Sequence, residues 1–373
     1  VSEGTETNGA NVFSAASTVG GYSTVSVVTS TSAVGGLDKE TIESIKFNAP
    51  KNYEAQNRAV TTQDYKKLVE DSVSGLDTVA VWGGQDDAVP KYGTVFVSAK
   101  PTGADALSTS QKTLIKAALT DYNIVAISPE VVDPDLISLI FSLTVKYDSR
   151  LTTKASGVIA ASVIDTIQTY KTNNLNKFSS IFRYSVLSKN IDATDTSVLG
   201  NLLTLTAKKG LTPSLTANNS YTISFNNAIY NPSTTYEGAV TSSAFAYTDS
   251  AGTTYSTSYL DDLNGVMRIF YYSGSDKLII ANDAGTVAYG NGHITLTSFK
   301  PDSFAGSTLD FTIEPATNDL IPVRNQIFTI ANTDITVTMQ DDADTGTTTT
   351  SASSTGSTDS ITSGTATGSS TVY

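Results

Sequence analysis

Apolar and polar residues alternate along the stretch from residue 139 to residue 147. Leu139, Leu143 and Val145 occupy odd-numbered positions, and Ser142 and Lys146 lie between them. Successive side chains of a strand point to opposite faces, so this period of two predicts a long strand with one buried face. The longest apolar runs of the chain have this length, which is too short to span a membrane.

The next segment changes to a period of three to four residues. Ile159, Val163, Ile167 and Tyr170 would lie on one side of a helix. Further helical turns are expected around residues 182–187, before a strand near residues 203–207. These elements predict a sheet covered by helices over residues 131–210.

Residues 37–130 carry a similar unit. Alternation predicts a strand over residues 95–99, and Ser108 with Gln111 forms a capping box that starts a helix. A return strand is expected at residues 124–127. The buried face of this helix is expected to contain Leu114, Ile115, Ala118 and Leu119.

Two shorter helices are expected before that strand. Asp38 can cap a helix over residues 41–45, and Pro50 then favours an extended passage because the residue before a proline avoids helical geometry. Thr61, with Asp64 three positions later, predicts the start of the second helix.

After Pro213 the pattern becomes all-β. Short alternating runs are separated by loops rich in Gly, Asn and Asp, which is typical of hairpins in a meander. Residues 211–340 are therefore expected to form a β-rich domain. The expected strands are 266–272, 277–281, 286–289, 293–299, 309–313, 326–330 and 335–339.

The two ends of the chain differ from the middle. Residues 1–36 are interpreted as the end of an upstream β element, and a missing upstream part is expected because the chain opens at Val1 within a β-like pattern. In residues 341–373, 19 of 33 residues are Ser or Thr, so this tail is expected to be disordered unless a partner holds it. The fold class predicted for the whole chain is α+β.

Composition narrows the range of functions. A net charge of −13 argues against broad nucleic-acid binding, which requires clustered Lys and Arg. The chain has no cysteine, so disulfides, thiolate metal sites and cysteine nucleophiles are excluded. A charged fraction of only 16% and many Ser, Thr, Asn and Gly residues favour β structure with many turns.

Motifs for catalysis are weak. His293 is the only histidine and follows a Gly-Asn-Gly sequence, so it is interpreted as a turn or edge residue. Asp344-Thr345-Gly346 matches an aspartic-protease tripeptide but lies in the tail without a preceding apolar strand. The adjacent pairs Asp86-Asp87 and Asp261-Asp262 would point apart or into solvent. We therefore predict no enzyme activity, no cofactor and no metal site.

Three aromatic residues are candidates for an interface. Trp82 is the only tryptophan, and Tyr271 and Tyr272 follow Phe270 on one expected strand with Tyr271 facing the opposite way. Packing over the first sheet is the favoured explanation for Trp82, and an interface role is the alternative, since tryptophan is enriched in binding hot spots. Strand propensity is the plain alternative for the two tyrosines.

A series of short motifs over residues 33–101 resembles the baseplate J-like family, the wedge proteins of contractile phage tails. Their order and spacing carry the resemblance more than any one of them. The matching residues are Gly35-Gly36, Glu40, Ala49-Pro50, Arg58-Ala59-Val60-Thr61, Asp64-Tyr65, Trp82-Gly83-Gly84, Tyr92-Gly93 and Lys100-Pro101.

The resemblance implies a J-like core of small sheets covered by helices over residues 37–210, followed by a mainly antiparallel β domain. It implies a structural role in the virion, at the tail baseplate, after assembly in the host cytoplasm. The protein would join copies of itself, as a dimer or through ring contacts, and other wedge proteins around the tail hub, and rearrange when the sheath contracts. Neither nucleic acid nor membrane is an expected partner.

Two other functions remain open from the sequence. Ser/Thr-rich β segments and acidic charge are compatible with a secreted or surface-layer adhesin fragment, although the mixed α+β centre argues against it. A tail-associated glycan hydrolase would need two carboxylates across a cleft, which a sequence cannot show.

Overall fold

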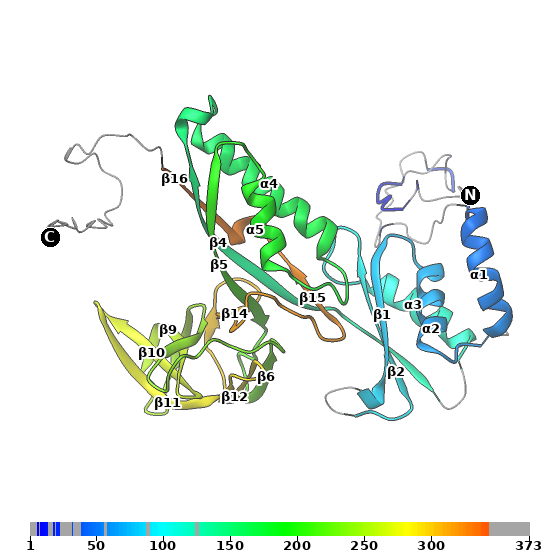
Figure 1. Cartoon of the computed structure of the whole chain (residues 1–373). Coiled ribbons are helices and arrows are strands. Elements are labelled where there is room, and N and C mark those ends of the chain that lie inside the picture. Colours follow the sequence, from blue (N-terminus) through cyan, green and yellow to red (C-terminus); the bar gives the residue numbers. More distant parts are fainter. Residues whose placement is uncertain are drawn as a thin grey trace, which may run out of the picture.

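A computed structural model of the chain has an elongated shape with three regions, which Figure 1 shows side by side. The structure describes residues 39–55, 58–86, 90–123 and 127–342, with isolated residues 6, 8–13, 18, 20–22 and 32 before them. Most of residues 1–36, which were expected to end an upstream β element, and the tail after residue 342 lie outside the described residues. Helices and strands of mixed pairing confirm the α+β class.

The first region contains a three-stranded sheet with the order β1-β2-β3. Strands β1 and β2 are antiparallel, whereas β2 and β3 are parallel. Its separate core includes Tyr65, Val97, Ile115 and Leu119. The elements are α1 (Ile42–Ala55), α2 (Thr62–Ser72), β1 (Leu76–Gly83), η1 (Gly84–Asp86), β2 (Thr94–Pro101), α3 (Thr109–Asp121) and β3 (Ser128–Val132).

Both expected capping boxes are present. Thr61 starts α2 and exchanges hydrogen bonds with Asp64, and Ser108 does the same with Gln111 at the start of α3. Burial raises the pKa of the Asp64 carboxyl. Hydrogen bonds from the N–H groups of Thr61 and Val60 outweigh this effect and hold the pKa below its ordinary value.

Two predictions in this region were wrong in detail. Helix α1 continues through Pro50 to residue 55, because a proline disfavours the helical conformation of its predecessor without forbidding it. The return strand lies at Ser128–Val132, later than the 124–127 expected, and residues 124–126 are outside the described ones.

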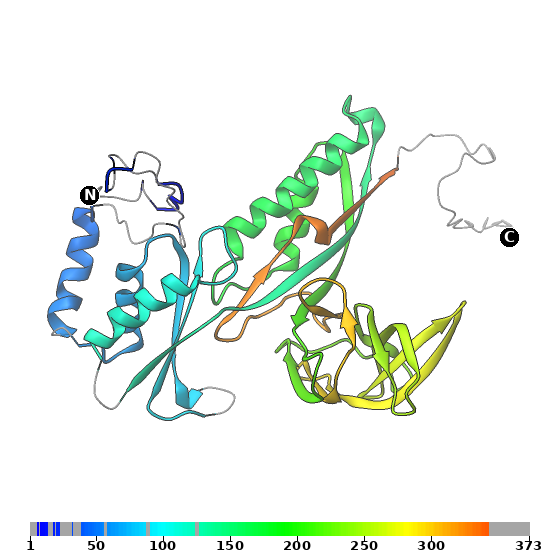
Figure 2. The same cartoon turned by 180° about the vertical axis from the view of Figure 1, so that it is seen from behind.

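The central region is a long-stranded sheet covered by two helices, best seen from behind in Figure 2. Strand β4 (Asp135–Tyr147) pairs antiparallel with β5 (Val198–Leu211). The apolar stripe expected on α4 is buried, with Ile159, Val163 and Ile167 fully covered. The remaining elements are η2 (Ser149–Leu151), α4 (Ser156–Asn174) and α5 (Tyr184–Asp192).

The last two strands return to this central sheet. β15 (Gln326–Thr329) and β16 (Ile335–Asp341), joined by η3 (Asn332–Asp334), both pair parallel with β4. Strands from both sides of the domain boundary expected at residue 210 therefore belong to one sheet. The hydrophobic core is also continuous from the central region into the β region.

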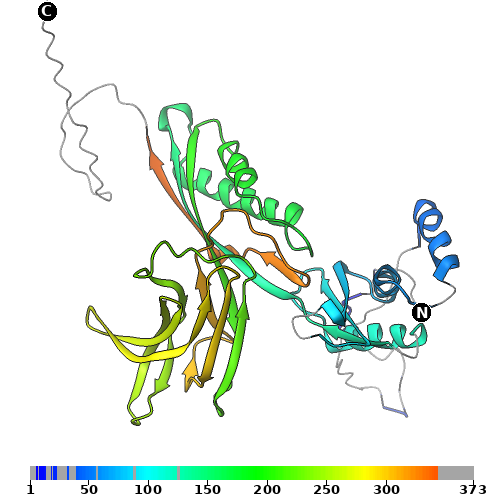
Figure 3. The same cartoon turned by 60° about the horizontal axis from the view of Figure 1, so that its bottom comes forward.

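The β region is connected to the central sheet through the end of β5, where residues 207–211 pair with β14. Figure 3 shows the strands of this region side by side, with the long β10–β11 hairpin projecting from it. The strands are β6 (Asn219–Ser224), β7 (Glu237–Ser242), β8 (Phe245–Thr248), β9 (Thr254–Leu263), β10 (Val266–Ser273), β11 (Asp276–Ala288), β12 (His293–Phe299), β13 (Ser303–Phe304) and β14 (Leu309–Ile313).

One expected loop is part of a strand. Residues 282–285 were expected to separate two strands, but β11 runs through them with irregular register against β10. Gly285 has a φ of 156°, and a Cβ there would lie 2.0 Å from the Thr295 carbonyl oxygen on β12. The glycine therefore permits close approach of two strands and does not mark a turn.

Candidate functional site

Trp82 lies near the end of β1, just before the bend at Gly83-Gly84. Its ring stacks on Phe96 of β2 with a centroid distance of 5.6 Å and an interplanar angle of 23°. The side chain is half-buried, yet its Nε1–H is buried and has no hydrogen-bond acceptor among the described residues. Burying such a donor without an acceptor costs free energy that simple core packing would not require.

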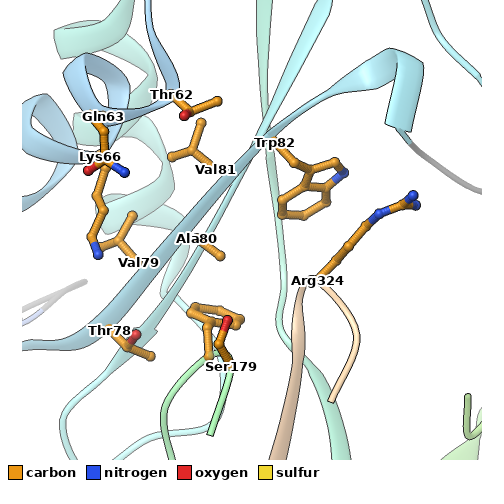
Figure 4. A pocket seen from close by; sticks show the side chains of 11 residues that line it. Thr62, Gln63, Lys66, Thr78, Val79, Ala80, Val81, Trp82, Ser179 and Arg324 are labelled. Atoms are coloured by element: carbon orange, nitrogen blue, oxygen red, sulfur yellow. The ribbon is translucent and has the colours of Figure 1, made fainter. Parts of the chain in front are cut away.

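A cavity of about 490 Å³ opens beside Trp82, between the first and the central region. One side comes from α2 and β1, and the other from loops that contain Ser179 and Arg324. Figure 4 shows Arg324 on the side of β1 where the indole ring lies, and Lys66 on the other side of the strand. The lining residues are Thr62, Gln63, Lys66, Thr78–Trp82, Phe178, Ser179 and Arg324.

Tyr271 and Tyr272 lie on opposite faces of β10, as the alternation predicted. Tyr271 packs on Tyr255 with ring centroids 4.8 Å apart. The ring centroid of Tyr272 lies 5.4 Å from that of Phe270 and 5.9 Å from that of Tyr259. These three rings form a row across β9 and β10. Strand β10 pairs with β9 only as far as Phe270, so Tyr271 and Tyr272 are paired with β11 alone.

The outer part of the β10–β11 hairpin carries exposed apolar side chains. Tyr272 is 55% exposed, Leu278 42% and Ile279 38%. Leu278 is paired with Tyr271 across the hairpin, so it lies on the opposite face from Tyr272 and Ile279. We name Tyr272 and Ile279, which share one face of the hairpin, the hairpin patch. Trp82 belongs to the first region, so the structure does not bring the three candidate residues into one site.

The sequence interpretation missed a charge cluster at this hairpin, in which Asp261 and Arg268 are buried. Asp261 is paired with Arg268 at 2.6 Å and also with Lys277, and Glu237 accepts from Lys277 at 3.0 Å. The Lys277 ammonium also lies 4.5 Å from the centre of the Phe270 ring. The cluster ties β7, β9, β10 and β11 together and leaves Asp261 without access to a substrate.

Asp262 faces the other way and has different partners. Its carboxylate accepts from the Val240 N–H at 2.6 Å and from the Tyr289 hydroxyl. Burial raises the pKa of Asp262, and burial together with the bond to Asp262 raises the pKa of Tyr289 to about 12. The adjacent aspartates therefore point apart, as expected, but both are buried and neither faces solvent.

The other chemical candidates are dispersed. His293 begins β12, between β11 and β6, and its Nε2 lies 2.9 Å from the Asn226 side-chain oxygen. Within the described ranges, no three His, Asp or Glu side chains gather as metal ligands would. None of the described helices is long and apolar enough to cross a membrane. Asp87 and the tripeptide at 344–346 fall outside the described residues.

Two family models match this fold in chain order. Residues 61–132 match the model described as baseplate structural protein gp6, C-terminal domain I, which here covers α2 to β3. Residues 137–209 match the model for C-terminal domain III, which covers nearly all of β4 to β5. The cavity beside Trp82 therefore lies between these two matched units.

One relative is similar over a longer stretch. Over 209 residues the chain is 30% identical to the baseplate wedge protein gp6 of Enterobacteria phage T4. The matched stretch covers 54% of this chain and 31% of the T4 protein. The match thus spans less than a third of that relative. Together with the family models, it confirms the resemblance: over these residues the chain is similar to the gp6-like baseplate wedge proteins.

A solved structure with local similarity is the six-fold symmetrised baseplate of the anti-feeding prophage. The likeness covers 46% of this chain and 39% of that chain, with 18% identity and a TM-score of 0.33. A likeness with so low an identity and TM-score gives no information about the family.

Proposed function

We propose that the protein is a structural component of a phage tail baseplate and acts there by binding other proteins. The observation that carries the proposal is the 30% identity to the T4 wedge protein over 209 residues. The matches at 61–132 and 137–209 support it, since they follow one another along the chain in the order of the two model numbers, I before III.

In the proposed role, the chain joins copies of itself and other wedge proteins into the ring around the tail hub, and the ring rearranges on sheath contraction. The virion is its location, after assembly in the host cytoplasm. The hairpin patch and the surface around Trp82 are the proposed contact regions. An exposed apolar patch on a projecting hairpin is typical of an interaction surface.

Catalysis is not part of the proposed role. The buried carboxylates Asp261 and Asp262 are occupied by structural partners, and His293 is bonded to an asparagine. No specific observation favours the adhesin or the glycan-hydrolase alternative.

Immunogold electron microscopy of virions of the encoding phage tests the proposal. Antibodies against the β region should label the tail end distal to the head, at the baseplate. Purified tails that contain none of this protein by mass spectrometry would contradict it. Release of reducing ends from host polysaccharide by the purified protein, lost on replacing one carboxylate, would contradict the non-enzymatic role.

A further inference from the structure

Strand β1 has an unpaired edge. In the order β1-β2-β3 it pairs with β2 alone, and no other strand of the described part of the chain bonds to its outer side. An edge strand presents a row of backbone N–H and C=O groups that an added strand can bond. Proline, bulges and charged residues commonly protect such edges. Between Thr78 and Gly83 the strand contains none of these.

The cavity beside Trp82 runs along this edge. Five consecutive residues, Thr78 to Trp82, line it. Neighbouring side chains of a strand point to opposite faces, so a space that all five border lies at the side of the strand, where its backbone is accessible. A volume of about 490 Å³ is within the range of sites that bind a ligand.

The residues that line the cavity carry positive charge, whereas the whole chain is negatively charged. Lys66 on α2 and Arg324 are among the eleven lining residues, and none of the eleven is Asp or Glu, although the chain carries a net charge of −13. Glu70 lies 3.9 Å from the Lys66 ammonium, at the outer limit of an ion pair on an exposed surface. The lining therefore carries one cation on each side of β1.

The wall opposite β1 has an unusual backbone. Ser179 and Arg324 both line the cavity, and both have left-handed conformations, with φ values of 63° and 50°. Such conformations of residues other than glycine are unfavourable, and they cluster at active sites and ligand clamps. The buried Nε1–H of Trp82, which has no acceptor among the described residues, lies on the same side chain that borders the cavity.

We propose that this edge binds an extended, acidic segment of another protein, which adds to β1 as a further strand. Carboxylates of the segment would approach Lys66 and Arg324, apolar side chains would pack on Trp82 and Phe178, and backbone groups would bond β1. The inference rests on the geometry of this edge and not on the baseplate role, so either can fail alone.

Fluorescence anisotropy with the full chain tests this proposal. The probe is a labelled octapeptide, Thr-Val-Glu-Val-Glu-Val-Thr-Ser, compared with the same peptide carrying Lys at both Glu positions. The Glu peptide should bind about tenfold more tightly, because charge-assisted contacts favour it. Its addition should also slow hydrogen exchange in residues 76–83, and N-methylation of alternate peptide bonds should abolish binding.

Matched variants locate the effect. Lys66→Glu and Arg324→Glu should each remove the preference for the Glu peptide, whereas Lys116→Glu, on the exposed side of α3, should leave it unchanged. Melting temperatures equal to that of the unaltered protein show that the variants are folded. Equal affinity for both peptides, no saturable binding, or affinity unmoved by the two cavity variants would overturn the proposal. Displacement by inorganic phosphate at concentrations similar to the peptide would also overturn it, because it would show a site for small anions.

Discussion

Gly84 illustrates how one residue shapes the end of β1. A Cβ at this position would lie 2.1 Å from the Lys91 carbonyl oxygen, and the Gly84 carbonyl accepts the Lys91 N–H at 2.9 Å. The chain closes a loop here with two backbones in contact, which only glycine permits. The Trp-Gly-Gly sequence does not indicate that Lys91 is the residue whose backbone approaches Gly84.

We predict that Gly84→Ala destabilises the protein by about 1–3 kcal/mol, since the obstacle is backbone and cannot rotate away. Gly83→Ala is the matched control, because its added carbon would approach only Gln85 and Asp86 side-chain atoms, at 3.5 Å or more. Urea denaturation measures both variants. An equal loss of stability in the two would contradict the close approach at Gly84.

Asp195 gives a prediction for acid stability. The Lys154 ammonium at 2.6 Å and the Ser197 N–H at 3.0 Å lower the pKa of Asp195 from its ordinary 3.8 to about 2. A lowered folded-state pKa stabilises the fold above the ordinary value, and this contribution is lost as the pH falls through about 2.

In the Asp195→Asn variant this contribution is absent at every pH. Its stability deficit against the unaltered protein should therefore be largest above pH 4 and shrink as the pH approaches about 2. Chemical denaturation at a series of pH values measures the deficit. Asp165→Asn, on the exposed side of α4, serves as the control. A deficit independent of pH would show that Asp195 acts through packing.

Local residue patterns were predictable and long-range pairs were not. The capping boxes at Thr61 and Ser108 depend on contacts three residues apart, so the sequence alone specified them. The Asp261–Arg268 pair depends on the β9–β10 hairpin, which was missed. Asn264-Gly265, with φ values of 50° and 80°, is a typical hairpin turn and was the signal that could have placed Asp261 opposite Arg268.

At the scale of elements, β16 is the main surprise. It was predicted as a strand, but its partner β4 lies almost 200 positions earlier, in register from Ile335 beside Phe141 to Asp341 beside Tyr147. Alternation of apolar and polar residues indicates that a strand forms and which of its faces is buried. It does not identify the strand that pairs with it. The β-domain interpretation of residues 326–340 was based only on proximity in the chain.

We predict that a chain ending at Asp342 keeps the melting temperature of the full chain, because β16 and its last bond, from the Asp342 N–H to the Tyr147 carbonyl, remain. A chain ending at Ala331 should melt at a clearly lower temperature, since it loses the strand that covers one edge of β4 and the buried Ile335. Calorimetry compares the two. A lower melting temperature for the chain ending at Asp342 would show that later residues stabilise the fold.

At the scale of the whole molecule, the three regions present separate surfaces. The cavity beside Trp82 lies between the first and central regions, and the hairpin patch projects from the β region (Figure 1). The sequence predicted the candidate aromatic residues individually. It could not show that they belong to different surfaces, because that depends on the path of the chain through three regions.

We predict that the protein associates with itself through the hairpin patch, because exposed apolar side chains on a projecting hairpin can pack against a second copy. Sedimentation of the full chain over a wide concentration range should show a dimer. The double variant Tyr272→Ser, Ile279→Ser should weaken it, whereas Leu114→Ser, at an exposed site on α3, should not. A monomer at every concentration would remove the patch as a self-association surface.

The central claim is that the protein is a structural part of a tail baseplate. Electron microscopy of lysates from a phage whose copy of this gene is interrupted tests it most directly. We predict that such lysates contain no tails with complete baseplates, and that supplying the unaltered protein from a plasmid restores them. Tails with complete baseplates in the absence of the protein would contradict the account.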